Sequence, residues 1–166
     1  LMLDIVRNYY PVDSIQRVLD VMAQYKLNVL HLHLSDDEAW RLEIPGLPQL
    51  TDIGSKRGYT TDESECLLPM YCGGWDANAN TTANGYITRK EYIDLLKYAK
   101  ERHIRIIPEI DMPGHMRAAK KAMGNLLTDS LFDTRVYKSA QNYTDNVINV
   151  SLPYAIEFVD HLVTEI

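Results

Sequence analysis

Short apolar segments at residues 1–6, 28–34 and 104–111 set the pattern of the chain. Each is rich in Leu, Ile or Val and is shorter than an ordinary helix, which is typical of strands buried in a sheet. Because side chains alternate along a strand, Glu109 and Asp111 share one face of the third segment. The sequence therefore predicts three strands, the last of which ends with two carboxylates on the same face.

Between and after these segments, apolar residues recur every three or four positions and predict amphipathic helices. Two of these helices are expected to begin with a capping box, at Asp13 with Gln16 and at Thr88 with Glu91. Ser151 is the expected N-cap of the last helix. The apolar side of that helix comprises Ile156, Val159, Leu162, Val163 and Ile166. The alternation of strand and helix predicts an α/β fold, with a parallel sheet and the helices outside it.

Composition narrows the possible functions. The chain has 166 residues, 46% of them hydrophobic and 24% charged, which is ordinary for one soluble globular domain. The net charge is −6 and the 17 basic residues form no long run, so we expect no nucleic-acid partner. No apolar stretch approaches the roughly 18–20 residues that cross a bilayer, so we expect no membrane span. The chain starts inside a strand-like run with no signal peptide before it, which favours a fragment of a longer protein.

Polar residues gather directly after each predicted strand: Arg7 after the first, 36–38 after the second and 109–115 after the third. Functional residues at the carboxyl ends of successive parallel strands are typical of a (β/α)8 barrel, although a doubly wound sheet also places its site there. No Gly-rich phosphate loop follows any strand, which disfavours a nucleotide-binding sheet. Carboxylates beside His115 favour acid–base catalysis, and the alternative is a solvated strand end with a surface histidine.

Helical and strand periodicity fades between about residues 42 and 85, where Gly and Pro recur. An irregular segment of this length inside a compact domain usually carries function. Cys66 and Cys72 both lie in it, and their spacing leaves a local disulfide and two free thiols open as alternatives. Two cysteines alone are too few for a metal site.

Longer motifs stand at the three strand ends. Their sequences are Leu-Asp-Ile-Val-Arg-Asn at 3–8, His-Leu-His-Leu-Ser-Asp-Asp-Glu-Ala-Trp-Arg-Leu-Glu-Ile-Pro at 31–45 and Ile-Pro-Glu-Ile-Asp-Met-Pro-Gly-His at 107–115. In this order they resemble family 20 of the glycoside hydrolases, the β-N-acetylhexosaminidases. Cys-Leu-Leu-Pro at 66–69 and Gly-Tyr-Ile-Thr-Arg-Lys-Glu-Tyr at 85–92 resemble the chitobiase branch of that family. The resemblance implies a TIM (β/α)8 barrel, of which this chain covers about the first three β/α units.

On this resemblance, residues 1–166 are the N-terminal portion of a single catalytic domain. The implied activity is exo-acting removal of terminal N-acetylhexosamine, GlcNAc or GalNAc, from oligosaccharides such as chitobiose. The hydrolysis is retaining and substrate-assisted, because the 2-acetamido oxygen of the substrate is the nucleophile, and it involves no cofactor and no metal. The family's catalytic Asp-Glu pair follows strand four, so we expect that pair beyond this chain and expect the chain alone to be inactive. Exo-acting glycosidases of this kind are commonly exported, so we expect a secreted or periplasmic protein.

The resemblance assigns Arg7 to binding of the terminal sugar through its hydroxyl groups. A guanidinium fork fits two neighbouring hydroxyls better than the single ammonium of a lysine does. The alternative role of Arg7 is an ion pair with Asp4 or Glu109.

The candidate catalytic residues that the resemblance implies are Asp36, Asp111 and His115. Asp36 and His115 correspond to a relay behind the catalytic acid, where they would orient the acid and tune its pKa. Asp111 corresponds to a second carboxylate of the same pocket, with a structural and electrostatic role. Trp40 is expected to pack in the core rather than stack on a sugar.

Two other functions remain open. His31 and His33, together with Asp111 and His115, carry the ligand types of a metal-dependent barrel hydrolase. A chain without the acid is also compatible with a non-catalytic carbohydrate-binding fragment. Three β/α units leave two sheet edges open, so we expect the remainder of the barrel, or another copy of the chain, to complete the fold.

Overall fold

The computed structural model describes residues 1–70, 73–128 and 136–166. Along the chain, its elements are β1 (Met2–Asp4), α1 (Val12–Gln24), β2 (Val29–Ser35), α2 (Gln49–Asp52), α3 (Arg89–Glu101), β3 (Arg105–Ile110), α4 (Arg117–Met123), the 3-10 turn η1 (Gly124–Leu126) and α5 (Pro153–Glu165). All three predicted strands are present, the first of them shortened to three residues.

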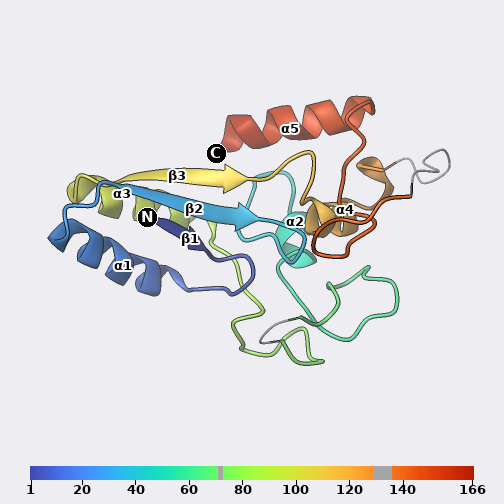
Figure 1. The fold of residues 1–166 in the computed structure, drawn as a ribbon, viewed down its shortest axis with the longest axis horizontal. Coiled ribbons are helices and arrows are strands. Elements are labelled where there is room, and N and C mark those ends of the chain that lie inside the picture. The colour runs from blue at the N-terminus through green and yellow to red at the C-terminus, as the bar shows by residue number, and fades with distance from the viewer. Residues whose placement is uncertain (71–72, 129–135) are drawn as a thin grey trace.

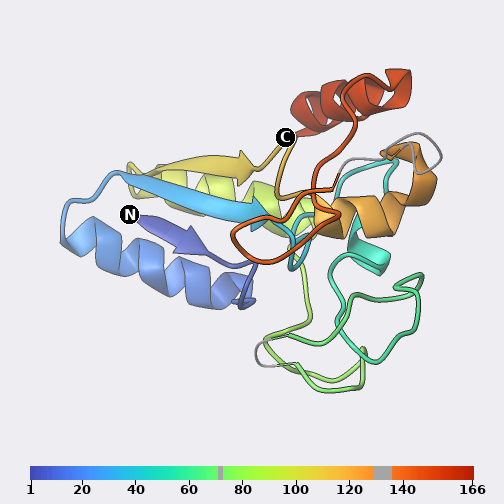
Figure 2. The ribbon, with the colours of Figure 1, turned by 45° about the vertical axis from the view of Figure 1, so that its right-hand side comes forward.

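The strands form a parallel sheet in the order β1-β2-β3. Leu32 in the central strand lies opposite Leu3 on one side and Pro108 on the other. The three arrows in Figure 1 point the same way, so the carboxyl ends of the strands meet at one edge, beside α4 and the long loops. Figure 2 shows α1 and α3 along the sheet, where they also contact each other. The parallel sheet with helices outside it is confirmed.

The core lies between this sheet and its helices. Leu30, Leu32 and Leu34 are all fully buried, as the alternation along β2 predicts. The same cluster takes in side chains from or beside α1, α3 and β3: Ile15, Leu19, Leu95, Ile104 and Ile106. Burial of one such side chain contributes roughly 1.5–3 kcal/mol, so the sheet and its helices hold each other in place.

Two helices differ in how they begin. At α3, Thr88 and Glu91 form the predicted capping box. At α1 the predicted box is wrong, because Pro11 is the N-cap, with φ −64° and ψ 158°, and no side chain caps the helix. Asp13 lies inside the first turn instead, where its carboxylate accepts the amide of Ser14 at 2.9 Å. An acidic side chain in that position is still favoured by the helix dipole.

The last helix, α5, begins at Pro153, and Leu152 rather than the predicted Ser151 is its N-cap. The fixed φ of proline suits the first helical position, which explains the shift. The side that packs inward comprises Ala155, Phe158 and Leu162. The ring of Phe158 lies 6.5 Å from that of Trp40, which is fully buried as predicted.

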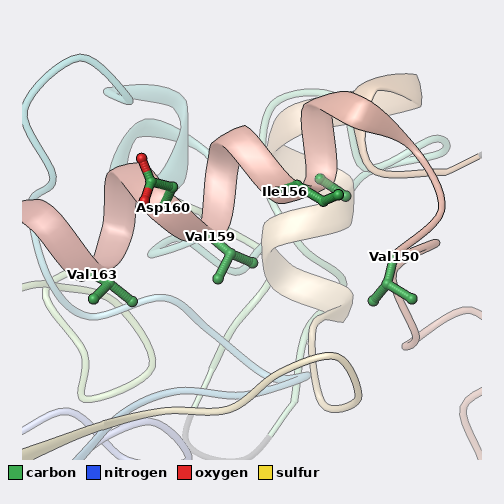
Figure 3. A pocket seen from close by; sticks show the side chains of 6 residues that line it. Val150, Ile156, Val159, Asp160 and Val163 are labelled. Carbon is green, nitrogen blue, oxygen red and sulfur yellow. The ribbon is translucent and has the colours of Figure 1, made fainter.

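The predicted apolar side of α5 is only partly buried. Leu162 is in the core, but Ile156 is 64% exposed and Val163 is 72% exposed. A groove of about 350 Å³ runs along this side and is lined by Val150, Ala155, Ile156, Val159, Asp160 and Val163. Figure 3 shows Val159 and Val163 projecting from the same side of the helix. This face therefore carries apolar surface that the described residues leave uncovered.

Apart from α2, the described residues between β2 and α3 form turns, bends and isolated bridges, as the loss of periodicity predicts. Buried charges attach this segment to α4: the carboxylate of Glu63 pairs with Arg117, and Lys121 lies 3.3 Å from the same carboxylate. Cys66 is buried, whereas Cys72, and with it the disulfide alternative, lies outside the described residues. Within the described ranges, no helix is long and apolar enough to span a membrane.

Candidate active site

The site begins where β1 ends. Asp4, the last residue of that strand, accepts the amides of Val6 at 2.8 Å and Arg7 at 3.2 Å. This turn directs the Arg7 guanidinium across the carboxyl edge of the sheet, where Nη1 lies 2.9 Å from the other oxygen of Asp4. Its Nη2 lies 2.5 Å from Asp36 Oδ2 and its Nε 2.9 Å from Glu38 Oε2. One guanidinium therefore holds carboxylates from two strand ends together.

An ion pair with Asp4 or Glu109 was the alternative role of Arg7, and the pair with Asp4 is present. Glu109 contacts His31 and His33 instead. Burial lowers the pKa of Arg7, but the hydrogen bond to Asp4 and the neighbouring carboxylates outweigh it and raise the pKa. The side chain nevertheless remains 32% exposed. The guanidinium is thus both permanently charged and accessible to a ligand.

Asp36 connects the groups of the site and is only 2% exposed. Its Oδ2 accepts His33 Nε2 at 2.9 Å in addition to the Arg7 guanidinium. Its Oδ1 accepts His115 Nδ1 at 2.8 Å and the Asp37 amide at 2.6 Å. Burial alone would raise the pKa of Asp36, but these hydrogen bonds outweigh it and lower the pKa. Asp36 is therefore held as a carboxylate between an arginine and two histidines.

His115 is brought to Asp36 by an unusual backbone conformation. Its φ is 56°, in the left-handed region, which costs a residue other than glycine about 1–2 kcal/mol. The hydrogen bond from Nδ1 to Asp36 raises the pKa of His115, and burial opposes this effect. Because Asp36 takes Nδ1, Nε2 is the nitrogen left for other contacts. The predicted pair of Asp36 and His115 is thus formed.

Asp111 and Glu109 share one side of the β3 end, as alternation predicts. Atoms of His33, Glu109 and Asp111 all lie within 4.8 Å of one another. Glu109 Oε2 lies 2.5 Å from His31 Nε2 and 3.1 Å from His33 Nδ1. Burial raises the pKa of Asp111, with the charge of Glu109 acting in the same direction and that of His33 against it. Asp111 therefore belongs to the same charged cluster as Asp36.

Two groups of three described residues could offer ligand atoms to a metal ion: His33 with Glu109 and Asp111, and Asp36 with Asp111 and His115. Neither group contains His31, and neither combines His33 with His115, so the predicted set of His31, His33, Asp111 and His115 is not brought together in either group. Each oxygen of Asp36 already accepts hydrogen bonds, and a cation there would compete with the guanidinium at 2.5 Å. The arrangement fits a hydrogen-bonded relay better than a metal centre.

Sequence reasoning gave no role to the two acidic residues after Asp36, and both contribute. Glu38 holds Arg7, and Asp37 accepts Asn146 Nδ2 at 2.8 Å and the Arg117 amide at 3.2 Å. Burial raises the pKa of both carboxyl groups. Three consecutive acidic residues directly after a buried strand were the available signal, because burial of that many carboxylates requires partners.

Arg41 was also missed, although it supports the segment that carries Arg7. It is fully buried and bonds to backbone carbonyls rather than to a carboxylate. These carbonyls belong to Ile5 (3.1 Å), Val6 (2.8 Å), Ser55 (3.2 Å), Ala83 (3.0 Å) and Gly85 (2.8 Å). The signal in the sequence is a charged residue between the apolar Trp40 and Leu42, where a free guanidinium would be costly.

Comparison with protein families matches residues 1–166 to glycosyl hydrolase family 20, catalytic domain. The chain belongs to this family. The N,N'-diacetylchitobiase of Vibrio harveyi is 41% identical to it over 184 aligned residues, which cover 100% of the chain and 20% of that relative. The β-hexosaminidase of Vibrio furnissii is 42% identical, with 100% of the chain and 26% of the relative covered.

Solved structures of family 20 enzymes agree with the fold. The exo β-N-acetylglucosaminidase of Vibrio harveyi, in complex with N-acetylglucosamine, matches with a TM-score of 0.87 and 44% identity, over 99% of this chain and 24% of its own. The Flavobacterium johnsoniae chitobiase matches with a TM-score of 0.72 and 30% identity, over 100% of this chain and 21% of its own. The chain thus spans about a quarter or less of these relatives, and it is part of a family 20 TIM-barrel catalytic domain.

Proposed function

We propose that the protein containing this chain is an exo-acting β-N-acetylhexosaminidase. It removes terminal GlcNAc or GalNAc from oligosaccharides such as chitobiose by retaining, substrate-assisted hydrolysis. The observation that carries the proposal is the cluster of Arg7, Asp36 and His115 at the carboxyl edge of a family 20 sheet. As with other exo-acting glycosidases, we expect export from the cytoplasm.

Arg7 binds the terminal sugar in this proposal. Three of its five N–H donors point at Asp4, Asp36 and Glu38, which fixes the plane of the guanidinium. Nη1 also lies 3.3 Å from His33 Nε2, but that nitrogen already faces Asp36, so the two remaining N–H groups are available to neighbouring hydroxyl groups. Because the carboxylates already hold the fork in position, little side-chain entropy is lost when a sugar binds.

In this proposal Asp36 and His115 do not contact the sugar but act through the catalytic acid. The carboxylate fixes which nitrogen of His115 carries the proton and favours its protonated form. The other nitrogen is then the donor that orients the catalytic acid, for which we propose a glutamate preceded by an aspartate, beyond residue 166. Asp111 adds a further charged or protonated carboxyl group to the same pocket.

We further propose that residues 1–166 are the N-terminal portion of a single (β/α)8 domain and supply about three of its β/α units. Support comes from the parallel order of β1, β2 and β3 and from the share of the relatives that the chain covers. The exposed apolar side of α5, with Ile156 and Val163, would then be covered by following units of the same protein (Figure 3). On this proposal, residues 1–166 by themselves are inactive.

The test is hydrolysis of a nitrophenyl N-acetyl-β-glucosaminide by the full-length protein and by its Arg7→Ala variant. Two hydrogen bonds from a charged group, at about 1.5 kcal/mol each, predict a loss of about 100-fold in kcat/KM. Arg17→Ala is the matched control, since Arg17 is 79% exposed and lies outside the cluster. A chelator should leave the rate unchanged.

Absence of hydrolysis by a folded full-length protein would refute the proposed activity. Binding of N-acetylglucosamine without turnover would favour a carbohydrate-binding protein instead. Activity that disappears with a chelator and returns with zinc would favour the metal-dependent hydrolase.

A further inference from the structure

His33 is a buried histidine with a carboxylate at each ring nitrogen. Its Nε2 lies 2.9 Å from Asp36 Oδ2, and its Nδ1 lies 3.1 Å from Glu109 Oε2. The second contact follows from the sheet, because the register of β2 and β3 places His33 opposite Glu109. The side chain is only 3% exposed, so the ring has little room to turn away from either carboxylate.

The two contacts differ in kind: Nε2 forms a hydrogen bond with Asp36, whereas Nδ1 lies at ion-pair distance from Glu109 without hydrogen-bond geometry. Burial lowers the pKa of His33, but the hydrogen bond to Asp36 and the charge of Glu109 outweigh it and raise the pKa. The imidazolium is therefore the form that this environment favours. His31 Nε2 lies 2.5 Å from the same oxygen of Glu109, so alternating histidines and carboxylates lie in contact from His31 to His115.

Asp36 requires this support because its two oxygens face different partners. Oδ2 is shared between Arg7 and His33, while Oδ1 is shared between His115 and the backbone amide of Asp37. A rotation of the carboxylate about its terminal torsion, which is soft, would weaken the contacts to Arg7 and His115 together. His33 opposes that rotation from the buried side, because its ring is only 2% exposed and its Nε2 bonds to Oδ2.

We infer that His33 is a positioning residue of the proposed hydrolysis: with the charge of Glu109 beside its other ring nitrogen, it holds Asp36 so that one carboxylate serves both the sugar-binding Arg7 and the relay histidine His115. This inference rests on the proposed function. It adds His33 and Glu109, which the proposed mechanism does not use.

The test compares His33→Leu, which removes the donor, with His33→Gln, whose amide can still donate to Asp36. The loss of one hydrogen bond to a buried carboxylate raises the pKa of Asp36, so the acidic limb of kcat/KM moves to higher pH by about one unit in His33→Leu. We expect kcat/KM to fall at least about tenfold, and His33→Gln to recover most of both effects. The titratable and charged groups that face Asp36 come from all three strand ends: Arg7, His33, Asp37, Glu38, Asp111 and His115.

His161→Leu is the matched control. It also removes a histidine hydrogen bond, from Nε2 to the carbonyl of Pro45 at 2.6 Å, but on α5 and away from the cluster. A purely structural role for His33 would lower the folded fraction and leave the pH limb in place, as we expect of the control. Thermal unfolding of each variant separates the two effects. If His33→Leu does not fold, the pH profiles of Glu109→Leu and Glu109→Gln are compared instead, because Glu109 is the residue that contacts the other ring nitrogen of His33.

The outcomes are distinct for the two proposals. A full-length protein that hydrolyses no N-acetylhexosaminide refutes the proposed function, and the inference with it. An active protein whose acidic limb is the same in His33→Leu and His161→Leu overturns the inference alone. A limb that shifts in His33→Leu and returns in His33→Gln supports it.

Discussion

Replacing Arg41 by leucine should weaken both the fold and the sugar site. The guanidinium is fully buried and donates to five backbone carbonyls from three separate parts of the chain. Two of these, at Ile5 and Val6, directly precede Arg7. Truncation therefore removes the support behind the residue that we propose binds the sugar.

The magnitude follows from the carbonyls that lose their donor. The carbonyl of Val6 keeps a bond from Arg57 at 3.2 Å, and that of Ser55 keeps the amide of Gly85. Three carbonyls remain to be counted, and an unsatisfied buried acceptor costs about 1–3 kcal/mol. Burial, with Arg57 nearby, lowers the pKa of Arg41 to about 9, so the charge itself is costly in the folded state and its removal offsets part of the loss. We expect a net destabilisation of about 3 kcal/mol.

The assay is thermal unfolding of the full-length protein together with KM for the nitrophenyl substrate. Arg41→Leu should lower the midpoint by about 2 °C and raise KM. Arg41→Lys should be intermediate, because one ammonium cannot reach all the carbonyls. Arg17→Leu, on the exposed side of α1, should change stability by less than about 0.5 kcal/mol. Equal midpoints for Arg41→Leu and Arg17→Leu would refute this argument.

Two further substitutions test the long segment before α3. Glu63→Gln breaks a buried pair with Arg117 and should cost about 3 kcal/mol at pH 7, measured by thermal unfolding. Burial raises the pKa of Glu63, but the hydrogen bond to Arg117 outweighs burial and lowers the pKa. The stabilisation by the ionised carboxylate is therefore complete above the unfolded value of 4.5 and is lost as the pH falls through the folded pKa. A difference in stability between the parent protein and Glu63→Gln that does not shrink in acid would contradict this. Gly85→Ala should destabilise by at least about 1 kcal/mol, because φ is +126° and the new Cβ would lie 2.5 Å from Tyr9 Cδ1. Gly74→Ala, with nothing within 4 Å, is its control, and equal unfolding midpoints for the two variants would rule out the steric argument.

Local patterns in the sequence were reliable where one interaction dominates. A continuous apolar run predicts a strand, and segments 28–34 and 104–111 both contain one. Burial on both faces holds only at the end of β2, whereas in the third segment Ile104 and Ile106 are buried and Ile107 is 39% exposed. The capping box at Thr88 needs only residues within one turn. Both wrong caps lie beside a proline, Pro11 or Pro153, whose fixed φ decided the helix start more strongly than a side-chain bond did.

The site depended on contacts that local patterns do not contain. The resemblance to family 20 gave the pair of Asp36 and His115, which are 79 residues apart. It did not give Glu38 as a partner of Arg7, because that contact depends on the turn after β1 and on the path of the chain after β2. Helical periodicity likewise identified the apolar positions of α5 without saying which of them the described residues bury.

Arg41 and Arg57 join the segment between β2 and α3 to the residues that follow β1, and this has a consequence for how the sequence can evolve. Both donate to backbone carbonyls, Arg57 also to that of Glu38 at 2.7 Å, and a carbonyl is the same whichever side chain the residue carries. Mutations that change exposed side chains along this segment therefore leave these carbonyl contacts in place. We expect relatives to diverge freely at the loop surface while they retain the two arginines, so that new substrate preferences can arise beside the site without loss of the fold.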